Sequence, residues 1–496
     1  DWFPHPSPDG RTIVFLSFPQ GTEGHNERGL RVQLRSIPVP DAAGKSGSPV
    51  TLAEFTGGQG TINVNSWSPD SKRFAYVSYE PWPGSGIEVG TPRVVIGGIT
   101  NASPAWQPNP ELVGQLSQKQ PAFNYDESRV GSYTLPDPLE SSRGRVRTTK
   151  EWRERRAEIL ELFREHVYGR SPGKPERVRF ETTQEDASAM NGRAILKRVA
   201  ILSSHKGREH RFELTMFVPK GASGRVPVFL LLNNRPSTNT DPTRAQTSGF
   251  WPAEEMIARG YGIAALQNNE LAPDDKSRFR EGVLQLFEGT TTGPRAGNAW
   301  AALAAWGWGA SRAMDYFESD RQVDARRVAV LGHSRGGKAA LWAGAEDERF
   351  ALVISNESGE GGAALTRRNY GETLARITES FPHWFAGNYR TFAERVHELP
   401  VDQHMLLALI APRALYVASA DEDLWADPRG EFLSQVHASP VYALFGEPEI
   451  RADQMPPLET PFVAGRRGYH IRSGTHNLTP YDWQAFAAFA DTLWKK

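Results

Sequence analysis

A serine flanked by glycines is the clearest chemical signal in this sequence. Gly332-His333-Ser334-Arg335-Gly336 follows a short apolar run at residues 327–331 and precedes a helical pattern. In a strand–turn–helix context, such a serine sits on a sharp turn that exposes its hydroxyl, and the glycines let strand and helix approach closely. The backbone N–H of Arg335 can donate to a developing oxyanion at the start of the helix. We therefore predict that Ser334 is a nucleophile for acyl transfer.

A serine nucleophile needs a base, which in sites of this type follows the serine and an acid along the chain. His437, His470 and His476 come late enough in the sequence. His476 stands in a glycine-led loop before the last helical stretch, whereas His470 lies in an alternating, strand-like run. We predict His476 as the base, because a loop at this place can reach over the edge of a sheet.

Two carboxylates could orient this histidine. Glu357 follows a strand-like run at residues 353–356, and Asp423 follows another at residues 415–417. A carboxylate buried against an imidazole fixes its tautomer and stabilises the imidazolium. General fold logic favours the later acid, Asp423. At least one of the three acids at residues 421–423 is expected to belong to a solvated turn.

The elements around these residues alternate between strands and helices. Continuous apolar runs recur at residues 227–232, 261–266, 327–331, 350–355 and 413–418, with helical stretches such as residues 299–317 between them. Runs of this length are typical of parallel strands that are buried on both faces. We predict an α/β fold over residues 151–496, namely the three-layer sandwich of an α/β-hydrolase with a mostly parallel central sheet.

Two segments near the N-terminus look alike. Each has a Ser-Pro-Asp turn, at residues 7–9 and 68–70, followed by a β-rich run. They resemble the repeats of TolB-type β-propellers, although two blades cannot close a propeller, and two unrelated hairpins are the alternative. We expect a small all-β, propeller-like segment at residues 1–105. Residues 106–150, rich in Pro, Gly, Asn and Ser, are expected to be a linker and an arm leading into the next domain.

The composition excludes several kinds of chemistry. The 496 residues include no cysteine, so disulfides, thiolate catalysis and cysteine-ligated zinc are ruled out. The net charge is -1 without long charged runs, so nothing predicts binding to nucleic acid or to an anionic membrane. No apolar stretch reaches the ~18 residues of a membrane span. The chain starts at Asp1 without a visible signal peptide, so we expect a mature form or a shortened chain.

Several separated motifs are similar to those of one enzyme family. They include residues 135–139 (Leu-Pro-Asp-Pro-Leu), 166–170, 305–313, 332–338, 356–359, 367–372, 423–427 and 474–477. On these motifs, the chain from about residue 120 to the end resembles a bacterial glucuronoyl esterase of carbohydrate esterase family 15. The resemblance implies hydrolysis of esters of glucuronic acid or its 4-O-methyl ether, as in lignin–glucuronoxylan linkages, without a metal or organic cofactor.

The same resemblance implies roles for five residues of the catalytic centre. Ser334 matches the nucleophile and His476 the base. Glu357 matches the family's acid, while Asp423 matches a second acidic position of bacterial members, so the sequence leaves open which one holds the histidine. Arg335 matches an arginine whose side chain supports the oxyanion.

Three further residues match sugar-contacting positions of the family: Lys338, Glu372 and Trp425. Each also has an ordinary structural alternative. Lys338 could be a surface cation, Trp425 a core residue, and Glu372 the partner of Arg367 or Arg368. The sequence departs from the family pattern at His333, where many relatives have cysteine, and in the loop of residues 233–239 beside the expected oxyanion site.

Three other functions remain as rivals at this point. A prolyl oligopeptidase-like serine peptidase would explain the elbow and the N-terminal repeats together, but about 100 residues are too few for its propeller. Another carbohydrate esterase, such as an acetyl esterase, and a non-catalytic carbohydrate-binding protein are the others. For the favoured function we expect a glucuronoxylan or lignin-carbohydrate ester as the substrate, a monomer, and a secreted or periplasmic location, inferred from the polymer.

Overall fold

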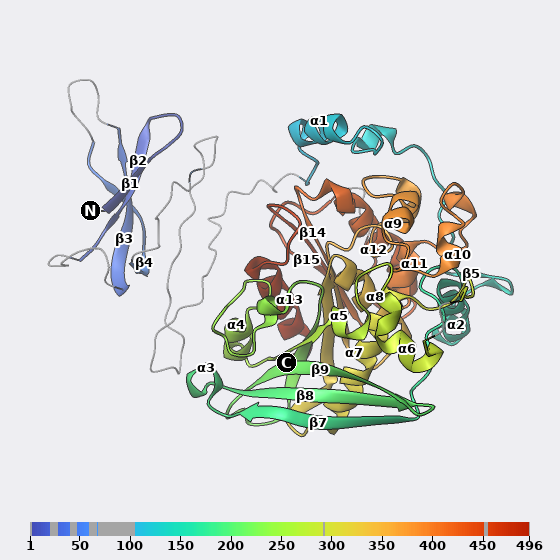
Figure 1. Ribbon diagram of the computed structural model, residues 1–496. Coiled ribbons are helices and arrows are strands. Elements are labelled where there is room, and N and C mark those ends of the chain that lie inside the picture. Colours follow the sequence, from blue (N-terminus) through green and yellow to red (C-terminus); the bar gives the residue numbers. More distant parts are fainter. Residues whose placement is uncertain are drawn as a thin grey trace. The chain divides into compact units, whose positions relative to one another are not determined.

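The computed structural model describes residues 2–19, 28–39, 47–58, 67, 105–290, 293–450 and 455–495. The chain forms two compact units, Asp1–Ala102 and Ser103–Lys496, which are described separately (Figure 1). In the described part of the chain, no helix is both long and apolar enough to cross a membrane.

The N-terminal unit holds one four-stranded antiparallel sheet, in the order β1-β2-β3-β4. Its strands are β1 (Trp2–Pro6), β2 (Thr12–Ser17), β3 (Arg28–Pro38) and β4 (Val50–Gly58). The first Ser-Pro-Asp turn forms as expected, with the Ser7 hydroxyl donating to Asp9 Oδ1 at 2.6 Å. A single sheet is not a propeller, so the expectation of a propeller-like segment is wrong. Turn signals specify a hairpin but not the repetition that closes blades into a ring.

The second turn segment, residues 68–78, lies outside the described residues. Trp67 precedes it and donates from its indole Nε1 to the carbonyl of His5 at 2.9 Å. Among the described residues of this unit, a small cluster of buried side chains packs together, formed by Val14, Leu16, Val32, Leu34 and Phe55.

The larger unit is built on a ten-stranded sheet with the order β15-β16-β14-β13-β12-β10-β11-β9-β8-β7. Six neighbouring strands are parallel: β10 (Val226–Asn233), β11 (Gly262–Gln267), β12 (Val323–His333), β13 (Leu352–Asn356), β14 (Ala414–Ala420) and β16 (Arg467–Arg472). Antiparallel strands extend both edges: β7 (Arg177–Asp186), β8 (Ala194–His205), β9 (Arg208–Pro219) and β15 (Phe462–Ala464).

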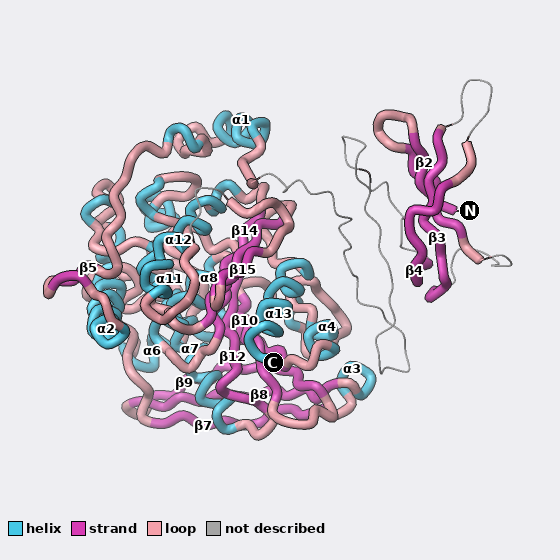
Figure 2. Tube along the Cα trace, turned by 180° about the vertical axis from the view of Figure 1, so that it is seen from behind, coloured by secondary structure: helices cyan, strands magenta, loops and turns pink. Residues whose placement is uncertain are grey.

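Helices cover both faces of this sheet, as Figure 2 shows with α13 and α4 on one side and α7, α11 and α12 on the other. Facing one core are α2 (Thr149–His166), α7 (Ala302–Ser319), α8 (Arg335–Glu346), α11 (Gln403–Ala408) and α12 (Pro428–Ala443). Facing the other are α4 (Ala253–Ala258) and α13 (Pro480–Trp494). Alternate residues of β10 enter the two cores, with Leu230 in one and Phe229 and Leu231 in the other.

The remaining helices are short or peripheral. They are α1 (Pro110–Lys119), α3 (Ala189–Gly192), α5 (Asn268–Leu271), α6 (Val283–Glu288), α9 (Leu374–Ser380) and α10 (Gly387–Arg390). Helix α1 and a two-stranded hairpin, β5 (Glu140–Ser141) and β6 (Gly144–Arg145), belong to the segment expected to be a linker and arm. That segment is anchored, because Tyr125 is 1% exposed and Gly371 N donates to the Asn124 carbonyl at 2.8 Å.

Candidate active site

Ser334 lies on the sharp turn between β12 and α8, in the predicted strand–turn–helix context. Its φ of 56° is in the left-handed region, which costs a non-glycine residue conformational energy. A Cβ on Gly332 would overlap the backbone of Gly336, and a Cβ on Gly336 would lie 2.7 Å from the carbonyl oxygen of Leu232. The glycines are therefore required by the close approach of α8 to β10 and β12.

His476 lies in the loop between β16 and α13, beside this turn. Its ring centroid is 4.4 Å from that of His333, the residue before Ser334. Its Nδ1 is 2.6 Å from Asp423 Oδ2 and 3.4 Å from Glu357 Oε2. Nδ1 must carry the proton to donate to these carboxylates, which leaves Nε2 as the acceptor for a serine proton. The side chain of His476 is 38% exposed while both acids are buried, so the imidazole is the accessible member of the group.

The other late histidines are placed elsewhere. His470 is fully buried in β16, where its Nε2 lies 2.8 Å from Asp482 Oδ1 and its Nδ1 lies 3.0 Å from the Tyr416 hydroxyl. His437 lies in α12. Of the three histidines considered from the sequence, the structure thus brings His476 to the serine turn.

Both predicted acids reach His476, but their surroundings differ. Glu357 has a φ of 46° and accepts hydrogen bonds from Arg472 Nη2 at 2.5 Å and from Asn477 N at 3.0 Å. For Asp423, among the residues that the structure describes, His476 is the one hydrogen-bond partner of the carboxylate. Of the neighbouring acids, Asp421 caps the loop by accepting from Gly474 N at 2.8 Å, and Glu422 is exposed.

The electrostatics of the group follow from burial and from these contacts. Burial, helped by the nearby charge of Asp423, raises the pKa of Glu357 to about 8, although the hydrogen bond with His476 opposes the rise. Burial lowers the pKa of His476, but the hydrogen bond and charge of Asp423, helped by Glu357, outweigh it and raise the pKa to about 10. These contacts therefore stabilise the imidazolium that forms once His476 has taken the proton of Ser334.

Arg335 follows the serine and is held by an acid that the sequence did not reveal. Its Nη1 bonds Asp274, and its guanidinium lies 5.2 Å from the ring centroid of Trp384. Its Nε is buried without a partner in the described residues. Asp274 also accepts from His383 Nε2 at 2.9 Å and Trp384 Nε1 at 2.6 Å. Burial raises the pKa of Asp274, but these hydrogen bonds and the charge of Arg335 lower it to about 2.

Comparison with known proteins identifies the family to which this chain belongs. Residues 201–446 match the family model described as glucuronyl esterase of fungi. The carbohydrate esterase MZ0003, from an unknown prokaryotic organism, is 40% identical over 418 residues, or 78% of this chain and 95% of that protein. The structure of a glucuronoyl esterase from Solibacter usitatus is 42% identical, covers 74% of this chain and 100% of its own, and superposes with a TM-score of 0.70. The chain belongs to carbohydrate esterase family 15.

A fungal relative adds to this result. A 4-O-methyl-glucuronoyl methylesterase of Schizophyllum commune is 28% identical over 333 residues, which are 65% of this chain and 76% of that protein. The predicted family and its α/β fold are thereby confirmed for the larger unit. The roles given to single residues stay predictions.

The three predicted sugar-contacting residues of this family-15 chain lie near the triad. Lys338 is 4% exposed, not a surface cation, and donates to the carbonyls of Ser358 and Glu360. Burial raises the pKa of Glu372, and the nearby charge of Lys338 opposes that rise. Trp425 is half-buried, and Phe123 packs edge-on against it with centroids 4.8 Å apart.

The alternative role of Glu372 as an ion-pair partner does not occur. Arg367 pairs with Asp402 at 3.1 Å, and Arg368 pairs with Asp427 at 2.7 Å and with Glu127 at 2.6 Å. These two arginines therefore anchor the loop that carries Glu372, and they leave its carboxylate to face Lys338.

Sequence reasoning missed the buried groups behind the triad. Arg472, 3% exposed, links Glu357 to Asp482, its Nε donating to Asp482 Oδ2 at 2.9 Å. Glu431 is fully buried and accepts from the backbone of Ser358 at 2.8 Å. A fully buried strand that ends in a charged residue before the histidine loop was the available signal for Arg472.

Glu357, Asp423 and His476 also form the group of potential metal ligands in the described chain, with ligand atoms within 4.8 Å of one another. The short bond from Nδ1 to Asp423 uses the proton that a metal would displace. The donor set therefore fits a hydrogen-bonded triad better than a metal site.

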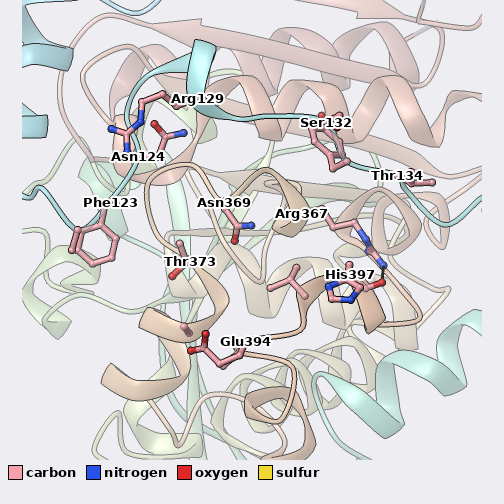
Figure 3. Close-up of a pocket in the computed structure, with 15 residues that line it drawn as sticks. Phe123, Asn124, Arg129, Ser132, Thr134, Arg367, Asn369, Thr373, Glu394 and His397 are labelled. Atoms are coloured by element: carbon pink, nitrogen blue, oxygen red, sulfur yellow. Dashed lines mark hydrogen bonds between the residues drawn. The ribbon is translucent and has the colours of Figure 1, made fainter.

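A cavity of about 770 Å³ has Phe123 in its lining. Figure 3 shows Phe123 near one end of it and Arg367 with His397 at the other. Its lining is mostly polar and includes Asn124, Arg129, Tyr133, Asn369, Thr373 and Glu394. The segments that form it, around residues 122–124 and 367–373, adjoin Tyr125 and include Glu372, and the charge of Asp423 contributes to the raised pKa of both.

Proposed function

We propose that this protein is a glucuronoyl esterase that cleaves esters of glucuronic acid or its 4-O-methyl ether in glucuronoxylan, including those with lignin alcohols. The observation that carries the proposal is the exposed His476, held by two buried acids beside Ser334, in a chain of family 15. The named relatives include a glucuronoyl esterase and a 4-O-methyl-glucuronoyl methylesterase.

The reaction would proceed through an acyl-enzyme. Nε2 of His476 takes the hydroxyl proton of Ser334, and Oγ adds to the uronic ester carbonyl. The bond to the alcohol breaks as His476 returns its proton to the leaving oxygen. Water then gives a proton to His476 as its oxygen adds to the acyl carbon, and the bond to Oγ of Ser334 breaks as His476 returns that proton to Oγ, which releases the uronate. The N–H at the start of α8 and the guanidinium of Arg335 stabilise the oxyanion in both halves.

The uronate ring would lie between the cation and the aromatic side chains near the triad. Lys338 and Glu372 can exchange hydrogen bonds with sugar hydroxyls, and Trp425 can pack on the apolar face of the pyranose. No step of this chemistry requires a metal or an organic cofactor.

We propose further that the cavity beyond Phe123 holds sugar residues of the xylan chain. Its volume of about 770 Å³ is within the ~300–1,000 Å³ of small-ligand sites and exceeds the space that one uronate needs. Amide, hydroxyl and aromatic groups are the usual contacts of a neutral sugar. Since such a polymer cannot enter a cell, we expect a secreted or periplasmic enzyme, and we expect it to act as a monomer.

The first experiment measures acid release from benzyl glucuronate by the wild type and by Ser334→Ala, beside p-nitrophenyl acetate and a prolyl peptide. The proposal predicts turnover of the glucuronate ester, lost in Ser334→Ala. Preferential cleavage of the acetate would indicate an acetyl esterase, and cleavage of the peptide a peptidase. Binding of the ester without turnover would indicate a carbohydrate-binding protein.

The second experiment tests the xylan cavity. Asn369 has a φ of 49°, so Asn369→Gly removes the side chain at a backbone position that glycine tolerates. We expect a several-fold lower kcat/KM on an esterified glucuronoxylan oligosaccharide and an unchanged value on benzyl glucuronate. The matched control is Asn191→Gly, an exposed asparagine with a φ of 57° in α3. Equal losses on both substrates would contradict a role in binding the chain.

A further inference from the structure

The loop after β10 reaches the same edge of the sheet as Ser334. Strands β10 and β12 are parallel and pair Leu232 with Gly332. Two residues beyond this pair, just past the ends of the two strands, the chain reaches Asn234 and Ser334. In folds of this type the loop after this strand supplies part of the oxyanion site. Arg235 is therefore beside the reacting centre by the register of the sheet.

Contacts on three sides fix the position of Arg235. Its Nη2 lies 3.3 Å from Nε2 of His333, and its guanidinium lies 5.9 Å from the ring centroid of Phe250. Its backbone carbonyl accepts from Gln267 Nε2 at 2.8 Å. Because arginine can only donate, Nε2 of His333 is the acceptor, and Nδ1–H of His333 donates to Asn356 at 2.7 Å. His333 thus serves as the neutral support of Arg235.

Arg235 has no carboxylate within ion-pair distance in the part of the chain that the structure describes. Burial lowers its pKa, the charge of Arg335 lowers it further, and Glu357 only partly compensates. By contrast, Arg335 is paired with Asp274. A half-buried cation beside a second cation, without a counter-ion of its own, is unfavourable unless an anion occupies the space that they share.

The proposed reaction supplies such an anion twice. The ester carbonyl becomes an oxyanion in each tetrahedral intermediate, and the released acid is a carboxylate at the same carbon. We propose that Arg235 is a further catalytic residue, which binds the oxyanion together with Arg335 and then the carboxylate of the uronate product. This inference rests on the proposed function and adds a charged contact that the family resemblance does not assign.

Product inhibition separates this role from a merely structural one. The experiment compares wild type, Arg235→Gln and Arg235→Lys in hydrolysis of benzyl glucuronate, with free glucuronate and neutral glucuronamide as inhibitors. We expect Arg235→Gln to lower kcat/KM by about tenfold to a hundredfold and to weaken inhibition by glucuronate at least tenfold, with glucuronamide changed less than twofold. Arg235→Lys keeps the charge and should recover part of the glucuronate inhibition.

Arg244 provides the matched control. It is on the same side of the sheet, follows in the same loop and is paired with Glu254 at 2.7 Å. Arg244→Gln should leave kcat/KM and both inhibition constants within twofold. Equal weakening of glucuronate and glucuronamide by Arg235→Gln, no weakening of either, or unfolding of both Arg235 variants would overturn the inference. Failure of the wild type to hydrolyse benzyl glucuronate would instead count against the proposed function.

Discussion

The Oδ2 atom of Asp423 lies 2.6 Å from Nδ1 of His476, well within hydrogen-bond distance. Glu357 approaches the same nitrogen only to 3.4 Å, and its oxygens already accept from Arg472 and from Asn477. A carboxylate that serves the imidazole alone is better suited to orient it and to stabilise its charge. The geometry thus favours Asp423 over Glu357 as the working acid, the choice that the family resemblance left open.

This preference predicts different pH profiles for the two acid variants. Asp423 is a main cause of the raised pKa of His476, about 10, so Asp423→Asn should lower that pKa. The rise of kcat/KM with pH, as the free histidine loses its proton, should move to lower pH. We expect kcat on benzyl glucuronate to fall about a hundredfold or more in this variant.

Glu357→Gln is the matched comparison for this prediction. It keeps an acceptor for Arg472 and removes the more distant charge, so the loss of kcat should stay within about tenfold and the shift of the profile should be smaller. A larger loss and a larger shift in Glu357→Gln than in Asp423→Asn would make Glu357 the working acid.

The turn that carries Ser334 should tolerate no side chain at Gly332. A Cβ there overlaps backbone atoms of Gly336, which cannot move without separating α8 from β12. We expect Gly332→Ala to lower the free energy of unfolding by about 3 kcal/mol or more, measured by urea denaturation. Gly114→Ala, in α1 with no atom within 4 Å of the new Cβ, should leave stability unchanged or slightly higher. Wild-type stability of Gly332→Ala would show that the turn is not closely packed.

Local patterns were enough to predict the parallel strands and the serine turn. The apolar runs at residues 227–232 and 327–331 became β10 and β12, because such runs are buried on both faces. The antiparallel strands β7–β9 were not predicted, because charged and polar residues interrupt their apolar runs and weaken the signal. Asp274 was missed for another reason, because it meets Arg335 from 61 residues away and no local pattern encodes such a contact.

Separation in sequence also hid the ion pair between Arg472 and Glu357, which are 115 residues apart, and its loss should be costly. Arg472 is buried between Glu357 and Asp482, so Arg472→Met would leave two buried carboxylates without their cation. We expect a loss of about 3–5 kcal/mol in the free energy of unfolding at pH 7, measured by urea denaturation. The control is Arg143→Met, which removes a pair with Glu154 whose side chains are 76% and 61% exposed, and should cost about 1 kcal/mol or less. Similar losses in both variants would contradict the importance of the buried network.

Asp274 should make the enzyme lose stability in acid. Its pKa of about 2 is below the ordinary 3.8, so the unfolded chain binds its proton first as the pH falls. The stabilisation is therefore complete above pH 4 and is lost as the pH falls towards 2, and a shift of nearly two units corresponds to about 2 kcal/mol. Asp274→Asn should flatten this part of the stability curve, measured by urea denaturation between pH 2 and 6.

Asp274 also anchors Arg335, so the same substitution should affect catalysis. We expect Asp274→Asn to lower kcat at pH 7 more than it raises KM. An unchanged kcat would mean that Arg335 needs no such anchor.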